Sequence, residues 1–136
     1  MTRKWFSIIA LIAAATLLFS LPSCGFNQHL VSITLQPAGG FVFEGLNAQG
    51  QFTALGTYIH PPETKDITDS VVWSIDVANF GTLTQTGQIT YTRTDGCGSG
   101  DVTATFYSNP SNPSAGSTVV ASAPVKGSKD GTSACQ

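Results

Sequence analysis

The chain has 136 residues, of which 41% are hydrophobic and only 10% are charged, and its formal net charge is −2. This length suits one domain plus a processed segment, and the scarcity of Glu, Lys and Leu beyond the N-terminal segment argues against a helix-rich architecture. Without Arg3 and Lys4, four basic residues stand against eight acidic ones. The remaining chain therefore has no basic face, and we expect no nucleic-acid partner.

Residues 1–23 have the three-part plan of an export signal. Arg3 and Lys4 provide a positive start, residues 5–21 are almost entirely apolar, and the small residue Ser23 precedes Cys24. The sequence predicts an N-terminal signal helix that is removed on export. An uncleaved membrane anchor is the alternative, although the apolar run is at the short end for crossing a bilayer.

The segment Leu21-Pro22-Ser23-Cys24 resembles the lipobox of bacterial lipoproteins, with Pro22 in place of the usual small residue. This resemblance implies that Cys24 is diacylated and becomes the mature N-terminus, with residues 24–29 as a tether. Two or more acyl chains anchor a protein stably in a bilayer, whereas one does not. An ordinary cleaved signal without lipid is the alternative.

Apolar and polar residues then alternate with the period of half-buried β-strands. The alternating segments lie at residues 30–36, 41–43, 52–59, 71–76, 88–92, 101–107 and 119–125. Residues 60–66, which contain two prolines, are predicted to be a loop. The glycine-rich residues 93–100 precede a strand that is expected to begin near residue 101. About seven short strands with frequent turn signals predict an all-β, immunoglobulin-like Greek-key sandwich over residues 30–126.

The predicted core is aromatic and aliphatic. Its members are Phe52, Tyr58, Trp73, Ile75 and Phe106. Trp73 alternates with apolar neighbours, which favours a place between the sheets over an exposed platform for sugar stacking. Tyr107 falls on the polar face and is the better candidate for an exposed contact.

Several runs within residues 30–126 together resemble the bacterial Ig-like domain, group 2. They are residues 31–37, 56–58, 65–68, 71–74, 87–90 and 100–105. The resemblance implies a structural spacer or an adhesion module on a bacterial surface. The family has no shared catalytic residues, so none is expected here.

Cys97 and Cys135 remain if Cys24 carries lipid, and an exported protein tends to oxidise such a pair. The strands at 101–107 and 119–125 form a predicted hairpin, which returns the tail 127–136 to the end of the sandwich where Cys97 lies. We therefore expect a Cys97–Cys135 disulfide that closes the tail. Two free thiols are the alternative, and a metal site would need more ligands than lie nearby.

No catalytic motif stands out. Ser70, His60 and Asp69 can be drawn as a group, but no Gly-x-Ser-x-Gly elbow orients them. Residues 95–101 lack the ligand pattern of an EF-hand loop. Asp66 and Asp69 are more typical of solvated loop acids than of a calcium site. We expect no enzyme activity, no metal and no cofactor.

The sequence thus predicts an exported lipoprotein held to a bacterial membrane through lipid on Cys24 and facing the periplasm or the cell surface. Its expected role is that of a non-enzymatic, Ig-like structural or adhesion module. The alternatives are a binding module for glycan or envelope polymer, and an accessory subunit of an envelope assembly. The expected partner is accordingly an envelope protein or a glycan. A small enzyme would instead require a cleft around His60.

Overall fold

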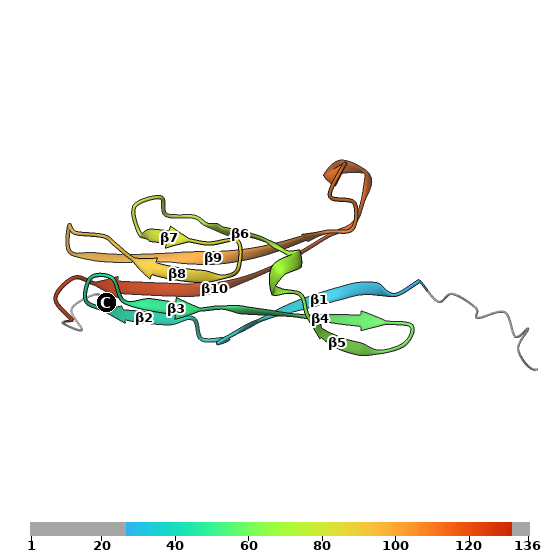
Figure 1. Ribbon diagram of the computed structural model, residues 1–136, viewed down its shortest axis with the longest axis horizontal. Coiled ribbons are helices and arrows are strands. Elements are labelled where there is room, and N and C mark those ends of the chain that lie inside the picture. The colour runs from blue at the N-terminus through green and yellow to red at the C-terminus, as the bar shows by residue number, and fades with distance from the viewer. Residues whose placement is uncertain (1–26, 132–136) are drawn as a thin grey trace, which may run out of the picture.

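The computed structural model describes residues 27–131, and these form ten strand segments and two short 3-10 helices (Figure 1). The elements are β1 (His29–Gln36), β2 (Phe41–Glu44), β3 (Gln49–Gln51), β4 (Thr53–Ile59), β5 (Glu63–Asp66), η1 (Thr68–Ser70), β6 (Val72–Ile75), β7 (Gly81–Leu83), β8 (Gln88–Tyr91), β9 (Cys97–Tyr107), η2 (Pro113–Ala115) and β10 (Thr118–Ser128).

The strands build a two-layer sandwich. In one layer β2, β10, β9 and β6 pair in that order. The other layer contains the sets β1-β4-β5 and β3-β8-β7, which are continuous because only Phe52 separates β3 from β4. With β3 and β4 counted as one strand, the strand order is that of an immunoglobulin-like Greek-key sandwich. The predicted all-β fold class is confirmed.

The hairpin of β9 and β10 runs along the long axis of the molecule (Figure 1). Its antiparallel register extends from Thr118 opposite Tyr107 to Ser128 opposite Cys97. Strand β9 therefore begins at Cys97, earlier than the expected start near residue 101. Strand β10 likewise continues to Ser128, past the expected end at residue 125.

Two glycines provide room for aromatic rings inside this hairpin. Gly98 and Gly127 lie opposite each other in the β9–β10 register. A Cβ atom on Gly127 would lie 2.3 Å from Cε2 of Tyr91, and one on Gly98 would lie 3.3 Å from Cδ2 of Phe80. The aromatic rings occupy the space that side chains would take, so glycine here marks close packing rather than a turn.

Three short strands were not predicted. β3 lies in the expected turn before Phe52, β5 lies in the expected loop at residues 60–66, and β7 follows Phe80. The two prolines, Pro61 and Pro62, fall in the turn before β5, which pairs with β4 from Glu63 opposite Tyr58 onward. The prolines therefore remove no ladder hydrogen bond, and β5 forms on the edge of the sheet.

The first strand changes face along its length. Strict alternation over residues 30–36 would place Val31, Ile33 and Leu35 on one face, but the β1–β4 register shifts between Leu30 and Ser32. Leu30 packs against the core as a result, whereas 48% of Val31 is exposed. A β-bulge of this kind reverses which residues point inward, because side chains alternate with a period of two.

The core contains Phe52 and Trp73, which are both buried as expected. Residues not singled out from the sequence join them: Phe43, Phe80 and Tyr91 are buried and form a connected aromatic cluster. Such aromatic pairs stabilise a core beyond the burial of their area. This cluster fills the end of the sandwich at which β2, β8 and β10 all end.

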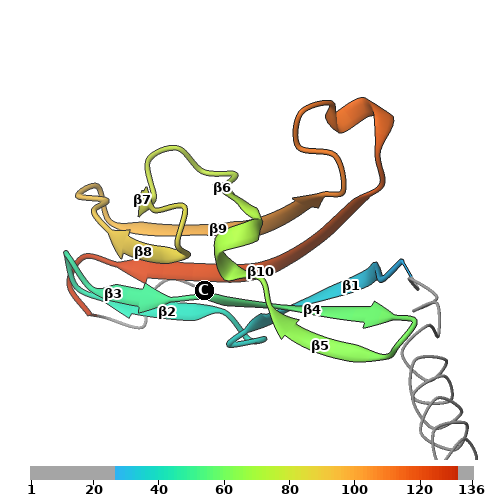
Figure 2. The same ribbon diagram turned by 45° about the vertical axis from the view of Figure 1, so that its right-hand side comes forward.

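The other three expected core residues, Tyr58, Ile75 and Phe106, are half-buried and pack against the core from its margin. Ile75 lies on β6, which is an edge strand. Tyr58 and Phe106 lie toward the end where the β9–β10 hairpin diverges from β1, β4 and β5 (Figure 2). The wider separation of the strands at this end agrees with the partial exposure of both side chains.

No helix within residues 27–131 is long and apolar enough to cross a membrane. The predicted signal helix of residues 1–23 lies outside the described residues.

Candidate binding site at one end of the sandwich

An open surface cavity of about 410 Å³, whose lining residues are exposed except for the half-buried Arg93, lies at the end of the sandwich that bears the β8–β9 turn. Two loops line it with the residues Ala78, Asn79, Thr92, Arg93, Thr94 and Asp95. The loops are fixed to the core beneath: the amide of Thr92 donates to the carbonyl oxygen of Phe80 at 3.2 Å, and Phe80 is fully buried. The cavity thus rests on the aromatic cluster and lies within the size range of ligand sites, roughly 300–1,000 Å³.

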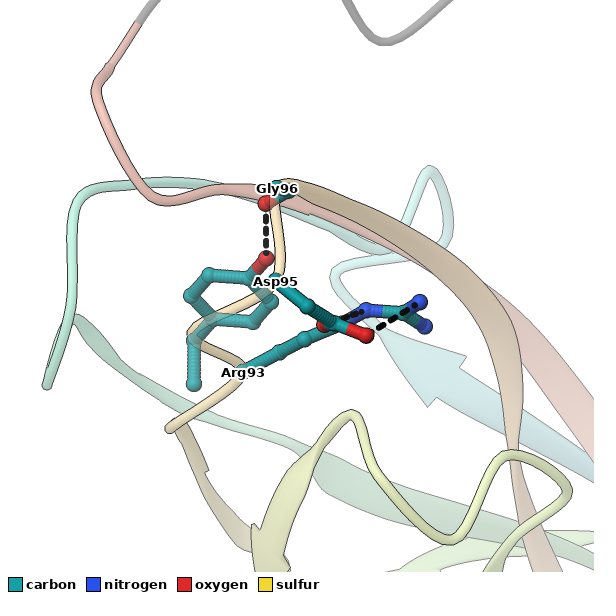
Figure 3. Close-up of polar contacts among 4 residues, drawn as sticks. Arg93, Asp95 and Gly96 are labelled. Atoms are coloured by element: carbon teal, nitrogen blue, oxygen red, sulfur yellow. Dashed lines mark hydrogen bonds and ion pairs between the residues drawn. The ribbon is translucent and has the colours of Figure 1, made fainter.

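An ion pair forms the charged wall of this cavity. Arg93 Nε donates to Asp95 Oδ1 at 2.6 Å, and Arg93 Nη2 donates to Asp95 Oδ2 at 3.3 Å (Figure 3). The Arg93 side chain is 26% exposed and that of Asp95 is 66% exposed. Arg93 Cδ would lie 3.0 Å from a Cβ on Gly98, so the arginine packs across this glycine of β9.

Tyr91 holds the turn beneath the ion pair. Its hydroxyl donates to the carbonyl oxygen of Gly96 at 3.0 Å (Figure 3). Gly96 has a φ of 102°, a conformation that glycine adopts readily and other residues rarely do. Burial raises the pKa of the Tyr91 hydroxyl above its ordinary value of 10.0, while the positive charge of Arg93 acts in the opposite direction.

The uncharged polar groups of the cavity are available to a ligand. Within residues 27–131, the side chains of Asn79, Thr92 and Thr94 make no hydrogen bond to another residue. Arg93 directs only its Nε and Nη2 donors at Asp95. The site therefore offers donors and acceptors side by side, with an overall charge near zero.

Polar residues at the opposite end of the sandwich hold the segment that leads into β1. Lys65 Nζ lies 3.0 Å from Glu63 Oε2 and donates to Gln28 Oε1 at 2.8 Å, and it lies 5.3 Å from the ring centroid of Tyr58. The Gln28 amide donates to Glu63 Oε2 at 3.1 Å. This hydrogen bond and the contact with Lys65 lower the pKa of Glu63. The first described residues are thus held against β5, and the β8–β9 turn lies at the far end (Figure 1).

The three residues considered and set aside as a catalytic group lie in two different elements. His60 is exposed in the β4–β5 turn, and Asp69 and Ser70 lie in η1. The nearby carboxylate of Asp66 accepts hydrogen bonds from the amide and hydroxyl of Thr68, at 2.9 and 2.6 Å, which lower its pKa. Among residues 27–131, no cluster of three or more His, Cys, Asp or Glu side chains could hold a metal ion.

The cysteines fall mostly outside the described residues. Cys97 opens β9 opposite Ser128, near the end of β10, whereas Cys24 and Cys135 lie in residues 1–26 and 132–136. Lipid on Cys24 and the Cys97–Cys135 bridge therefore stay predictions. Tyr107, the expected exposed contact, is half-buried on β9.

The free edge of β6 is occupied by a side chain. Gln85 Oε1 accepts from the amide of Trp73 at 3.3 Å, and Gln85 Nε2 donates to its carbonyl oxygen at 3.2 Å. This amide takes the place of a neighbouring strand and so works against pairing at that edge. It disfavours β6 as the edge through which an accessory subunit would join a partner.

Sequence reasoning missed Arg93 and Asp95 as site residues. The available signal was the spacing of opposite charges two residues apart in a glycine-rich segment, at one chain end of the β7–β8 hairpin, whose other chain end carries Asn79. No family model matches this sequence, and no curated protein matches it either. The resemblance to the bacterial Ig-like domain, group 2, therefore remains a prediction.

Proposed function

We propose that this protein is a non-enzymatic lipoprotein of a bacterial envelope, in which an Ig-like sandwich serves as a structural or adhesion module. The lipobox-like segment ending at Cys24 would supply the anchor, and the residues between Cys24 and Gln28 would supply the tether, which is shorter than the expected 24–29 because Gln28 is held against β5 and His29 begins β1. A rigid sandwich with recognition loops at its ends suits such a role, since loops on a rigid scaffold often carry binding.

The observation that carries the proposal is the position of chain entry. Gln28 is held against Glu63 and Lys65 at one end of the sandwich, only four residues after Cys24. The cavity of Arg93 and Asp95 lies at the opposite end (Figure 2). An anchor on Cys24 would thus leave the cavity end directed away from the bilayer.

We further propose that Cys97 and Cys135 form a disulfide. The register of Cys97 opposite Ser128 supports it, because the chain after Ser128 leaves β10 beside Cys97. Closing this loop would stabilise the fold by roughly 4 kcal/mol on a chain-entropy estimate. Reduction should then lower the melting temperature of the purified protein, and Cys135→Ser should melt at that lower temperature with or without reductant. An unchanged melting temperature on reduction would contradict the bridge.

Intact mass spectrometry of the protein purified from bacterial membranes tests the anchor. The expected mass is that of residues 24–136 with a diacylglycerol group and acyl chains, less two hydrogens for the disulfide. Cys24→Ser is the matched control, because it should lose the lipid mass and leave the membrane fraction. An unlipidated wild-type mass would overturn the proposal of a lipid anchor.

A further inference from the structure

We propose that the cavity between the β6–β7 and β8–β9 loops binds a neutral carbohydrate through neighbouring hydroxyl groups. The inference deepens the proposed function by naming the ligand class that the exposed end of the module would recognise. It needs the fold and the cavity, but it does not depend on lipid at Cys24.

The chemistry of the cavity matches a sugar. Each sugar hydroxyl both donates and accepts a hydrogen bond, so a pair of adjacent hydroxyls needs donors and acceptors close together. Asn79 supplies an amide with both, Thr92 and Thr94 supply hydroxyls with both, and the Arg93–Asp95 pair adds charged donors and acceptors. Hydrogen bonds to such charged groups are stronger than those between neutral groups.

The same chemistry disfavours other ligands. An anion placed near Arg93 would also meet the carboxylate of Asp95, which already occupies two of the guanidinium donors. A cation placed near the carboxylate of Asp95 would likewise meet the positive charge of Arg93. Ala78 is the only apolar side chain among the lining residues, and a largely apolar molecule would leave the polar groups of Asn79 and the threonines unpaired at a free-energy cost.

The cavity is held ready for a ligand by the core below it. The amide of Thr92 is hydrogen-bonded to Phe80, and Gly96 is hydrogen-bonded to the buried Tyr91. A preorganised site pays less ordering entropy on binding. For a monosaccharide with about a dozen heavy atoms, a dissociation constant of roughly a few mM is expected.

Titration of the full, ¹⁵N-labelled chain by NMR tests this inference. The probes are glucose, galactose and N-acetylglucosamine, with sodium acetate and sodium phosphate as anionic competitors. At least one sugar should produce saturable shifts confined to the amides of residues 78–80 and 92–96. Asn79→Ala should weaken that binding about 3- to 10-fold, the loss expected for one ligand hydrogen bond.

Asn112→Ala is the matched control. Asn112 lies at the opposite end of the sandwich, and its side chain likewise makes no hydrogen bond within the described residues; its removal should leave sugar binding unchanged. The inference is overturned if no sugar gives saturable shifts at about 50 mM, well above the expected dissociation constant. It is also overturned if acetate or phosphate saturates these amides, or if both asparagine variants weaken binding equally. None of these results would alter the membrane-anchor test by mass.

Discussion

Replacing Tyr91 by phenylalanine isolates one hydrogen bond in the core of the molecule. The Tyr91 hydroxyl donates to the Gly96 carbonyl oxygen at 3.0 Å, and its side chain is fully buried. Tyr91→Phe keeps the ring and its contacts with Phe43 and Phe80 but leaves the Gly96 carbonyl without this donor. We expect a loss of about 1–2 kcal/mol in the free energy of unfolding, or a melting temperature lower by about 5–10 °C for a domain of this size.

The same variant should change the pH dependence of stability. The pKa of Tyr91 is raised in the folded state, chiefly by burial, so the fold favours the protonated hydroxyl. The stabilisation is fully present below the ordinary value of 10.0 and is lost as the pH rises through the raised folded value. Tyr91→Phe should therefore show a shallower loss of stability above pH 10 than the wild type.

Urea unfolding followed by tryptophan fluorescence, repeated between neutral and alkaline pH, measures both effects. Tyr107→Phe is the matched control, since the Tyr107 hydroxyl makes no hydrogen bond within residues 27–131; it should change stability by less than about 0.5 kcal/mol. Equal stability of Tyr91→Phe and the wild type, or an alkaline loss as steep in the variant as in the wild type, would refute the reasoning.

Three further predictions concern the core and the η1 turn. Trp73→Ala should cost about 3–5 kcal/mol in chemical denaturation, because the ring is buried and its Nε1 donates to the Thr68 carbonyl oxygen at 2.9 Å; a loss below about 1 kcal/mol would contradict its core role. Gly127→Ala should lower the melting temperature, because its methyl group would overpack against Tyr91. Gly39→Ala is the control and should not lower it, because a Cβ there would meet no atom within 4 Å. Similar melting temperatures of the two variants would show that the Tyr91 ring moves aside at little free-energy cost. Asp66→Asn should make stability depend less steeply on pH in acid. The lowered pKa of Asp66 gives a stabilisation that is complete above its ordinary value of 3.8 and is lost as the pH falls through the folded value. An unchanged dependence in acid would mean that the hydrogen bonds from Thr68 do not stabilise the fold.

Period-two alternation predicted most of the long strands because each has one face against the core and one toward solvent. It failed where that asymmetry is weak or absent. β5 is exposed on every residue, so nothing in its pattern marks it as a strand. In β1 the alternation correctly predicted a strand, but the bulge reversed which of Leu30 and Val31 points inward.

The cavity was harder to foresee than the fold. Asn79 and Arg93 lie in different loops at the two chain ends of the β7–β8 hairpin, and the pairing of Gly81 with Tyr91 brings these loops together. The glycines of residues 96–100 carried conflicting signals: Gly96 adopts the positive φ of a turn, while Gly98 provides room for packed side chains within a strand. Composition cannot separate these two uses of glycine.

The sequence by itself determined that this chain forms a β-sandwich with Phe52 and Trp73 inside. The reason is that each strand has one apolar face, and burying these faces is the main driving force for folding. The tertiary structure decided the rest. The two layers stand apart at the end where the half-buried Tyr58 and Phe106 lie, and the pairing of β7 with β8 brought two loops together at one polar cavity. Both depend on how strands pair and layers pack, which the alternation within a single strand does not encode.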